Sequence, residues 1–387
     1  MPGDGGAAGG QAQQQRRHRK HSRVDDVANI KRGTRVARRW EIKRKLGEGG
    51  CGAIYEVVDL GTRPSSSTSS VTGTKLVEAT AGSSSSGGRP RGRFAMKVET
   101  RQPKTENVLK MEVAILRKLN EGKDYWKRHA CDLLDSGKTS QFCYLVMTLV
   151  GPSLSELRRK QRGGRLSLST TVRAAEGMLC ALRNLHDAGF IHRDLKPSNF
   201  TIGQGSNEQE RTIYLIDFGL ARQYVTTADP KVMRAPRRKV GFRGTTCYCS
   251  PTLHNREEQC RRDDLWSWAY TLIEVHKGLP WGSLHRKTDI IHMKKTMTDE
   301  DLCRGMPTEF VDILRRIRSV QYHERPSYNY LYAKLQLIMA HKRFRKEDPF
   351  DWEKDGCRGR RQSTALYQQQ QPPSQNYDDD PGSPEDT

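Results

Sequence analysis

Two short segments combine residue types that are suited to phosphoryl transfer. Residues 192–199 read HRDLKPSN and place an acid, Asp194, a cation, Lys196, and an amide, Asn199, at fixed offsets. Residues 215–219 read LIDFG and end an apolar run with a second acid, Asp217. Asp194 can accept a proton from a substrate hydroxyl, and Lys196 can neutralise a phosphoryl group in transfer. Because magnesium takes oxygen ligands, we expect Asn199 and Asp217 to hold Mg²⁺.

A glycine-rich stretch lies upstream, at residues 46–54, which read LGEGGCGAI. Glycines let a hairpin fold closely over phosphates and offer backbone N–H groups where a side chain would clash. Such a loop is a weak signal by itself. Here it is followed by FAMK at residues 94–97, which brings Lys97 onto a predicted strand.

The apolar spacing predicts a helix over residues 105–120. Its apolar face carries Val108, Ile115 and Leu119 at helical spacing. Glu112 falls on the same face, where an unpaired carboxylate is costly. We expect Lys97 to be its partner; the alternative is an exposed glutamate on a slightly rotated helix.

Three further elements position the acids. Residues 141–150 predict a buried strand that ends at a Gly-Pro turn, and residues 170–187 predict a helix that stops at Gly189. This helix leads into the segment that carries Asp194, and its His186 is interpreted as a packed residue near the helix end. A third apolar helix is predicted from Asp263 to about His276.

Composition indicates segments without a packed core beside the folded part. The chain has 387 residues, 34% of them hydrophobic, and a mean hydropathy of −0.81. We expect residues 1–37 to be a disordered basic tail and residues 354–387 a disordered Gln/Pro-rich acidic tail. Residues 61–92 are rich in Ser, Thr and Gly and predict a disordered insertion between two strands. The basic cluster at residues 16–21 is either a nuclear-import signal or a solubilising tail.

The net charge of +22 resides mainly on the folded part. Residues 1–39 carry ten Lys/Arg against three acids, and residues 363–387 carry five acids and no Lys/Arg. A field of this sign favours acidic protein substrates or other polyanions. Nucleic acid is not an expected partner, because no recognition motif with interleaved aromatic residues is present.

The cysteines indicate a reducing compartment, and the hydropathy pattern bears on membrane and secretory segments. Nine cysteines are scattered without a CxxC pair, so we expect free thiols in the cytoplasm or nucleus. No run of eighteen apolar residues and no apolar segment at the N-terminus are present, so we expect neither a membrane span nor a secretory signal. We expect a monomer.

The ordered motifs resemble the signature set of protein kinases. The resemblance implies an α+β, two-lobed fold over residues 38–353, with a small β-rich lobe carrying one main helix and a larger helical lobe. It implies ATP and Mg²⁺ as cofactors and protein hydroxyls as acceptors. Catalytic roles fall to Asp194, Lys196 and Asn199, and magnesium to Asn199 and Asp217. The nucleotide site comprises Leu46, Gly47, Glu48, Gly49, Gly50, Gly52, Ile54, Ala95, Lys97, Glu112, Met147 as gatekeeper, and Leu149.

The resemblance also assigns roles around the reacting groups. Lys97 pairs with the nucleotide's α- and β-phosphates, and the Lys97–Glu112 pair positions ATP. Asp264 tethers the catalytic loop from below and is read as structural support. Arg193 precedes the catalytic acid, and in many kinases this arginine binds a phosphorylated activation loop.

Other features resemble the casein kinase 1 superfamily of serine/threonine kinases. No Ala-Pro-Glu follows the activation loop, which spans residues 226–246; the chain instead reads VGFRGT at residues 240–245, and GPSL follows the predicted strand at residues 151–154. Residues 217–224, DFGLARQY, and 348–353, DPFDWE, look most like the tau-tubulin kinase branch. The casein kinase 1 resemblance implies that no activating phosphate is required.

Two positions depart from that family. Its usual arginine two residues after Gly-Thr is Cys247 here, so a preference for pre-phosphorylated substrates is not carried over. Its Ser-Ile-Asn segment is replaced by Ser250, Pro251 and Thr252, and proline lacks a backbone N–H and stiffens the chain. This substrate-facing segment is therefore expected to sit differently.

Two functions are weighed. The first is an active kinase acting in acidic sequence contexts, helped by five basic residues of the activation loop: Arg234, Arg237, Arg238, Lys239 and Arg243. For these residues a solvated charge run is the alternative interpretation. The second function is a catalytically weak or dead kinase-fold scaffold. Dead kinases usually lose one of Lys97, Asp194, Asn199 or Asp217, and this chain keeps all four. The acidic tail could also fold back as a pseudosubstrate.

Overall fold

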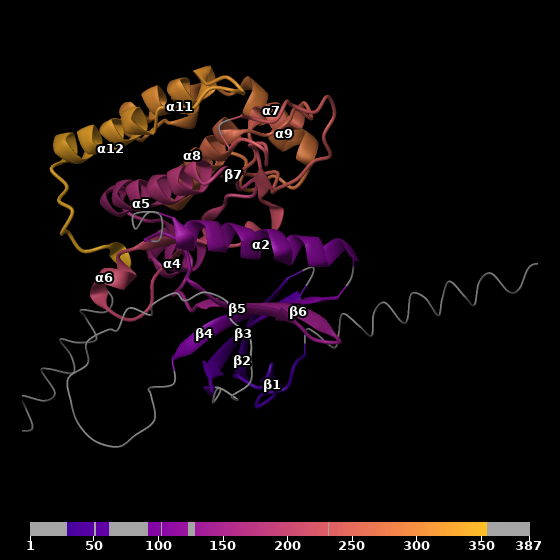
Figure 1. Cartoon of the computed structure of the whole chain (residues 1–387). Helices are drawn as coiled ribbons and strands as arrows, with labels where there is room; N and C mark the ends of the chain where they lie inside the picture. Colours follow the sequence, from indigo (N-terminus) through magenta and orange to yellow (C-terminus); the bar gives the residue numbers. More distant parts are fainter. Residues whose placement is uncertain are drawn as a thin grey trace, which may run out of the picture.

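The computed structural model describes residues 29–49, 52–61, 92–101, 103–122, 128–230 and 232–353. The expected two-lobed α+β fold is confirmed: a six-stranded antiparallel sheet and helix α2 form the small lobe, and helices dominate the large one (Figure 1). Most of the predicted insertion, most of the N-terminal tail and the whole C-terminal tail lie outside the described residues.

The sheet of the small lobe has the strand order β1-β2-β3-β4-β6-β5. Its strands are β1 (Arg35–Val36), β2 (Trp40–Gly49), β3 (Gly52–Asp59), β4 (Arg93–Thr100), β5 (Leu133–Lys138) and β6 (Phe142–Thr148). Alternation along the strands divides the side chains between two faces. Met96 and Val98 join a core around Trp40 on one face, whereas Ala95 and Met147 join the larger core shared with the helices.

The folded chain begins earlier than residue 38, so the boundary predicted for the tail was drawn too late. β1 lies within the range 1–37 and pairs with β2, with Val36 opposite Trp40. The backbone N–H of Ile30 also donates to the Tyr55 hydroxyl at 3.1 Å. A two-residue strand in an Arg-rich context has no apolar alternation, which is why the sequence did not indicate it.

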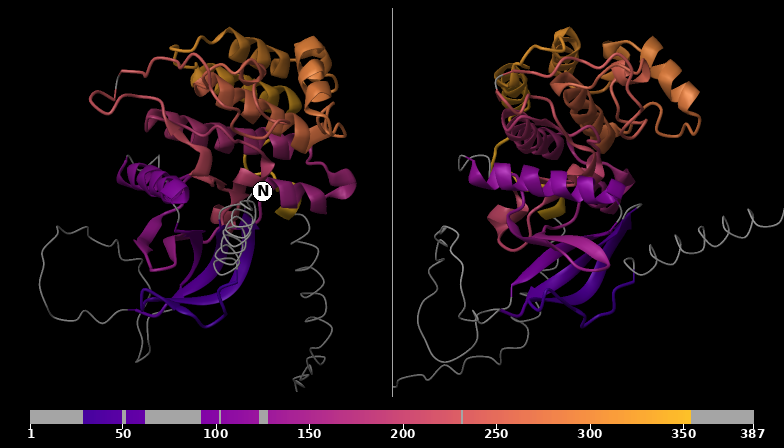
Figure 2. Two further views of the ribbon diagram at one scale, coloured as in Figure 1. Left: turned by 90° about the vertical axis from the view of Figure 1, so that its right-hand side faces the viewer. Right: turned by 45° about the vertical axis from the view of Figure 1, so that its right-hand side comes forward.

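Helix α2 (Pro103–Glu121) lies between the sheet and the helical lobe (Figures 1 and 2). Ile115 and Leu119 are fully buried, and Glu112 is 1% exposed on the same face. The predicted helix and its apolar face are therefore confirmed. One helix thus carries an acid to the boundary between the lobes.

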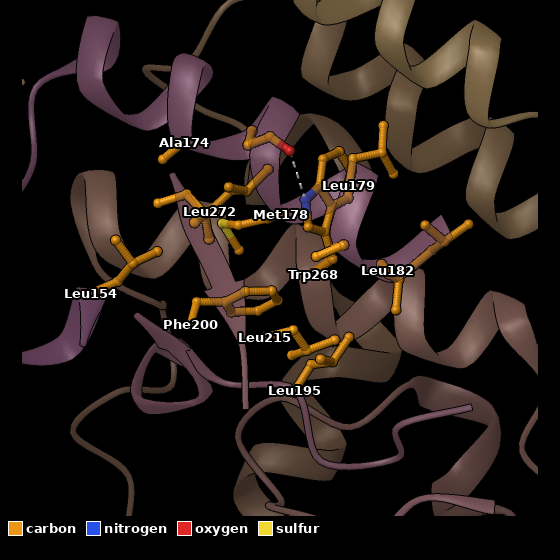
Figure 3. Packing of buried hydrophobic residues seen from close by; sticks show 14 of the residues in the cluster. Leu154, Ala174, Met178, Leu179, Leu182, Leu195, Phe200, Leu215, Trp268 and Leu272 are labelled. Carbon is orange, nitrogen blue, oxygen red and sulfur yellow. Dashed lines mark hydrogen bonds between the residues drawn. The ribbon is translucent and has the colours of Figure 1, made fainter. Parts of the chain in front are cut away.

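The large lobe is built around two long helices, α5 (Leu168–Asp187) and α8 (Arg261–Lys277). Figure 3 shows their contact, where Trp268 packs among Met178, Leu182 and Phe200 and donates its indole N–H to the Ala175 carbonyl at 3.4 Å. The remaining helices are α4 (Leu154–Lys160), α6 (Asn207–Glu210), α7 (Pro251–His254), α9 (Lys287–Thr296), α10 (Asp299–Leu302), α11 (Glu309–Ser319) and α12 (Tyr328–Lys342), with the 3-10 turn η1 (Arg162–Gly164).

Short strands and turns of the large lobe carry the reacting segments. They are β7 (Phe190–Ile191), η2 (Pro197–Asn199), β8 (Phe200–Ile202), β9 (Ile213–Leu215), η3 (Phe218–Leu220) and β10 (Arg222–Gln223). β7 pairs with β10 and β8 pairs with β9, both antiparallel. These two ribbons hold the segments around Asp194 and Asp217 side by side.

The last described residues bind the N-terminal end of helix α5, where Ser167 is the N-cap. Asp351 accepts hydrogen bonds from the Ser167 backbone N–H at 2.6 Å and from its hydroxyl at 2.9 Å. Arg173 stacks over the Phe350 ring at 4.2 Å. The segment read as the end of the domain is therefore anchored to its centre. None of the helices in the described ranges has the length and hydropathy of a membrane span, and no disulfide joins the cysteines there.

Candidate active site

A buried carboxylate, Asp264, fixes the catalytic loop that follows β7. Its Oδ2 accepts from the His192 backbone N–H at 2.7 Å, and its Oδ1 accepts from the Arg193 N–H at 2.9 Å. His186 Nε2 lies 2.9 Å from Oδ2, and Arg193 is held at a φ of +69°. Burial raises the pKa of Asp264, but the bonds from His186 and His192 outweigh it and the pKa lies below its usual value. The supporting role expected for Asp264, and the packed role of His186, are confirmed.

His192 connects the catalytic loop to the segment that ends in Asp217. Its Nδ1 accepts from the Asp194 backbone N–H at 3.3 Å, and its Nε2 lies 3.1 Å from the Ile216 carbonyl. Because Nδ1 accepts, we assign the ring proton to Nε2. The imidazole thus joins the two acidic segments through their backbones.

The carboxylate of Asp194 is bound on both oxygens. Lys196 Nζ donates to Oδ2 at 2.7 Å, and the Thr245 hydroxyl donates to Oδ1 at 2.7 Å. Asn199 donates from its Nδ2 to the Asp194 carbonyl at 2.9 Å. The three residues predicted from the HRDLKPSN segment therefore lie together, and a fourth, Thr245, joins them from the substrate-facing loop.

Lys97 links the small lobe to Asp217. Its Nζ lies 2.7 Å from Glu112 Oε2 and 3.1 Å from Asp217 Oδ1, so the expected Lys97–Glu112 pair is confirmed. Burial lowers the pKa of Lys97, but the two carboxylates outweigh it and the net shift is upward. Burial likewise raises the pKa of Asp217, and Lys97 reverses that shift so that the carboxyl stays ionised.

The residues predicted to hold magnesium fit a cation of that kind. Asp217 adopts a left-handed conformation (φ +65°) that leaves its side chain 48% exposed. The amide nitrogen of Asn199 donates to the catalytic loop, so the oxygen is the atom of that amide that could ligate a metal. One carboxylate and one amide oxygen suit magnesium, which keeps waters and phosphate oxygens among its ligands.

The glycine-rich hairpin between β2 and β3 has two kinds of glycine. A Cβ added at Gly47 or Gly49 would meet nothing, so these two positions leave open space beside the hairpin. A Cβ at Gly52 would come within 1.8 Å of the Val98 carbonyl, so this glycine is required by β4. Glu48 pairs with Ala53 in the hairpin, and Gly50 lies outside the described residues.

Apolar residues predicted for the nucleotide site lie on the neighbouring strands β2, β3, β4 and β6 and just beyond β6. Ala95 on β4 is directly opposite Met147 on β6, and both are buried. Ile54 and Leu149 are partly buried and pack against the same large core, whereas Leu46 is 36% exposed. The arrangement offers an apolar surface next to Lys97, suited to a flat ring.

Glu99, which the sequence did not single out, is a buried acid on the same face of β4 as Lys97. It is 4% exposed, and no hydrogen bond reaches its Oε2 from the described residues. Burial raises its pKa to about 7; Lys97 opposes this, and Glu112 and Asp217 add to it. Its position two residues after Lys97 was the available signal, because alternate strand residues share a face.

The substrate-facing loop is supported by a buried lysine, Lys294, that the sequence also did not indicate. Its ammonium donates to the carbonyls of Thr246 and Cys249, each at 2.7 Å, and burial lowers its pKa to about 8. Ser250 caps helix α7, and Pro251 occupies the first turn, where a missing N–H costs nothing. The Ser-Pro-Thr departure therefore forms a regular helix start.

The five basic residues of the activation loop do not behave alike. Arg234 donates from its Nε to the Val225 carbonyl at 2.9 Å, and Arg237 binds the carboxylate of Glu258. The other three, Arg238, Lys239 and Arg243, are exposed. Only these three match the interpretation of a solvated basic surface.

Comparison with known proteins gives a consistent result. A family model described as the protein kinase domain matches residues 90–342. A Caenorhabditis elegans protein whose name assigns it provisionally to the serine/threonine-protein kinases is 36% identical over 322 residues, which cover 83% of this chain and 84% of that protein.

Two further relatives carry more specific names. A Caenorhabditis elegans protein named as an inactive tau-tubulin kinase is 32% identical over 255 residues, covering 63% of this chain and 87% of that protein. Casein kinase I homolog 3 of Schizosaccharomyces pombe is 35% identical over 225 residues, covering 56% of this chain and 50% of that protein. The expected resemblance to the casein kinase 1 superfamily and its tau-tubulin branch is thereby confirmed.

Proposed function

The chain belongs to the protein kinase family and, on that premise, we propose that it transfers the γ-phosphate of ATP to protein serine and threonine hydroxyls in acidic sequence contexts. One observation carries the proposal. Lys97 contacts Glu112 and Asp217 at once, which aligns helix α2, the nucleotide lysine and the metal-binding acid. Kinases require this pair and the metal-binding acid to be in place together.

The geometry supports a role for each reacting residue. In this proposal, Asp194 accepts the proton of the substrate hydroxyl. Lys196, which donates to the same carboxylate, neutralises the charge of the phosphoryl group during transfer. Asn199 and Asp217 would hold magnesium, which supplies charge neutralisation for the phosphates. Phosphoryl transfer needs little covalent chemistry from the protein, so positioning and electrostatic stabilisation are sufficient.

The acidic context is supported by the exposed part of the activation loop. Arg238, Lys239 and Arg243 face solvent in the segment that leads to Thr245. Cys247 occupies the position at which the family usually has an arginine, and its thiol is half-buried against the large core. Selectivity for acidic residues is therefore assigned to the three exposed cations and not to position 247.

A scaffold without catalysis is the second candidate, favoured by the relative that is named inactive. Transfer of ³²P from labelled ATP to casein or acidic peptides distinguishes the two functions. The proposal expects transfer by the wild type and loss of transfer in Asp194→Asn, which keeps the shape of the side chain. Equal, background-level transfer by both proteins would establish the scaffold instead.

A further inference from the structure

A buried carboxylate, Glu258, lies between the activation loop and helix α8. It is 6% exposed. Arg237 donates from its Nη2 to Oε1 at 3.0 Å and from its Nε to Oε2, and so binds both oxygens. Arg222 Nε lies 3.7 Å from Oε1. Because a bidentate pair is directional as well as strong, Glu258 fixes the position of residue 237.

Arg193 of the catalytic loop is close enough to Glu258, Arg222 and Arg237 to interact with their charges. Burial lowers its pKa to about 10, and Arg222 and Arg237 act in the same direction, while Glu258 and Asp264 oppose them. Three arginines from three different segments therefore repel one another across a partly buried region. Glu258 is an anion set among them, and its own pKa is lowered because Arg237 and Arg222 outweigh the effect of burial.

These arginines belong to the segments that hold the reacting groups. Arg222 on β10 pairs with Ile191 on β7, directly before the catalytic loop. Arg193 donates from its Nε to the Leu220 carbonyl at 2.7 Å, three residues after the acid of the metal site. Arg237 lies in the loop that leads to Thr245. One carboxylate thus contributes to the placement of all three segments.

Carboxylate and phosphate are bound by arginine in the same two-pronged geometry. A phosphate added to a loop orders it by pairing with arginines, at the cost of needing a second enzyme to add it. We propose that Glu258 is a built-in replacement for such a phosphate: it orders the activation loop through Arg237 and Arg222, and it occupies the pocket that would otherwise bind a tetrahedral anion. The activity readout of this inference rests on the proposed kinase function; its binding readout does not.

Sulfate rescue tests the proposal. In Glu258→Ala we expect kcat to fall on the order of tenfold, as for the loss of one charged hydrogen bond, and millimolar sulfate to restore much of it. Glu257→Ala is the matched control, because it removes the same charge from an exposed neighbour. Neither the control nor the wild type should respond to sulfate when sodium chloride keeps the ionic strength constant.

Thermal unfolding gives a second readout that needs no activity. Sulfate should raise the Tm of Glu258→Ala by more than that of the wild type or Glu257→Ala, since only the first has an empty anion pocket. If the wild type proves inactive, the proposed function fails while this measurement still decides the inference. Equal Tm shifts in all three proteins would overturn it.

Arg237→Ala covers the case in which Glu258→Ala does not fold. The side chain of Arg237 is half exposed, so its removal leaves no large cavity. We expect kcat to fall as in Glu258→Ala and sulfate not to restore it, because an arginine that binds the anion is missing. Wild-type kcat in Arg237→Ala would contradict the proposal that the Arg237–Glu258 pair orders the activation loop.

Discussion

The Thr245 hydroxyl donates a 2.7 Å hydrogen bond to Asp194 Oδ1, so the substrate-facing loop is joined directly to the residue that we propose accepts the substrate proton. The preceding residue makes this approach possible. Gly244 has a φ of +115°, and a Cβ there would lie 2.6 Å from the Arg193 carbonyl. The two loops therefore meet at a position where only glycine fits.

Replacing Thr245 with valine should lower kcat by about tenfold to a hundredfold. Valine keeps the shape but removes the hydroxyl, and a hydrogen bond to a charged group contributes about 1.5–3 kcal/mol. Steady-state transfer to an acidic peptide measures the effect, with Thr245→Ser as the control that keeps the hydroxyl. Full activity in Thr245→Val would show that the bond does not orient Asp194.

Asp264→Asn should destabilise the domain by about 3 kcal/mol in denaturant unfolding. Both carboxylate oxygens accept backbone N–H groups, and one of them also faces His186. In asparagine one of the two oxygens becomes an NH₂ group. That NH₂ would face a buried backbone N–H, so two hydrogen-bond donors would meet without an acceptor.

The difference in unfolding free energy between the wild type and Asp264→Asn should depend on pH with a defined sign. The folded pKa of Asp264 is lowered, so its stabilising contribution is present above the usual value of 3.8 and is lost as the pH falls through the folded pKa. The gap between the two proteins should therefore narrow in acid. Asp289→Asn, on an exposed position, is the control and should leave the unfolding free energy unchanged.

Elements with strong periodicity could be predicted closely from the sequence. The helix expected at residues 105–120 is α2 (Pro103–Glu121), and the one expected at 170–187 is α5 (Leu168–Asp187). The pairing of Glu112 with Lys97 followed because a carboxylate on an apolar face needs a partner. In these cases the physical cause acts within a short stretch of chain.

Contacts between single polar residues of distant loops could not be predicted. Thr245 meets Asp194 across 51 positions, and Arg237 meets Glu258 across 21, and neither residue lies in a periodic pattern. The activation loop was read as one basic run because its composition does not show which arginines the fold binds internally. Strand β1 was not predicted for a related reason, because its formation depends on pairing with β2 and not on a pattern in its own two residues.

Neutralising the three exposed cations should raise the KM for acidic peptides. In the triple variant Arg238→Ala, Lys239→Ala and Arg243→Ala, kcat should change little, because all three side chains are exposed. The difference from the wild type should shrink as salt is added, since exposed charges are screened. Peptides with acidic residues replaced by alanine serve as the matched substrates.

The opposite result would be informative for the same variant. If the triple variant used acidic and alanine-substituted peptides with the same ratio as the wild type, the basic loop would be a solvated surface without a role in selectivity. A fall in kcat with unchanged KM would instead indicate that the loop had been displaced from Asp194.

Glu99→Gln should stabilise the nucleotide-free protein above pH 7 and leave it unchanged at low pH. The carboxyl has a folded pKa of about 7, raised from 4.5, so the folded state holds a proton that the unfolded state releases between these values. Stability in the wild type therefore falls as the pH rises from about 4.5 to 7. Glutamine carries no charge at any pH and has nearly the same shape.

At pH 8 the Glu99→Gln variant should be more stable than the wild type by about 1–2 kcal/mol, a figure that allows for partial screening. Urea unfolding at pH 5 and pH 8 checks this, with Glu48→Gln on the exposed hairpin as the control. A constant difference between wild type and Glu99→Gln across this range would mean that Glu99 stays ionised in the fold beside Lys97.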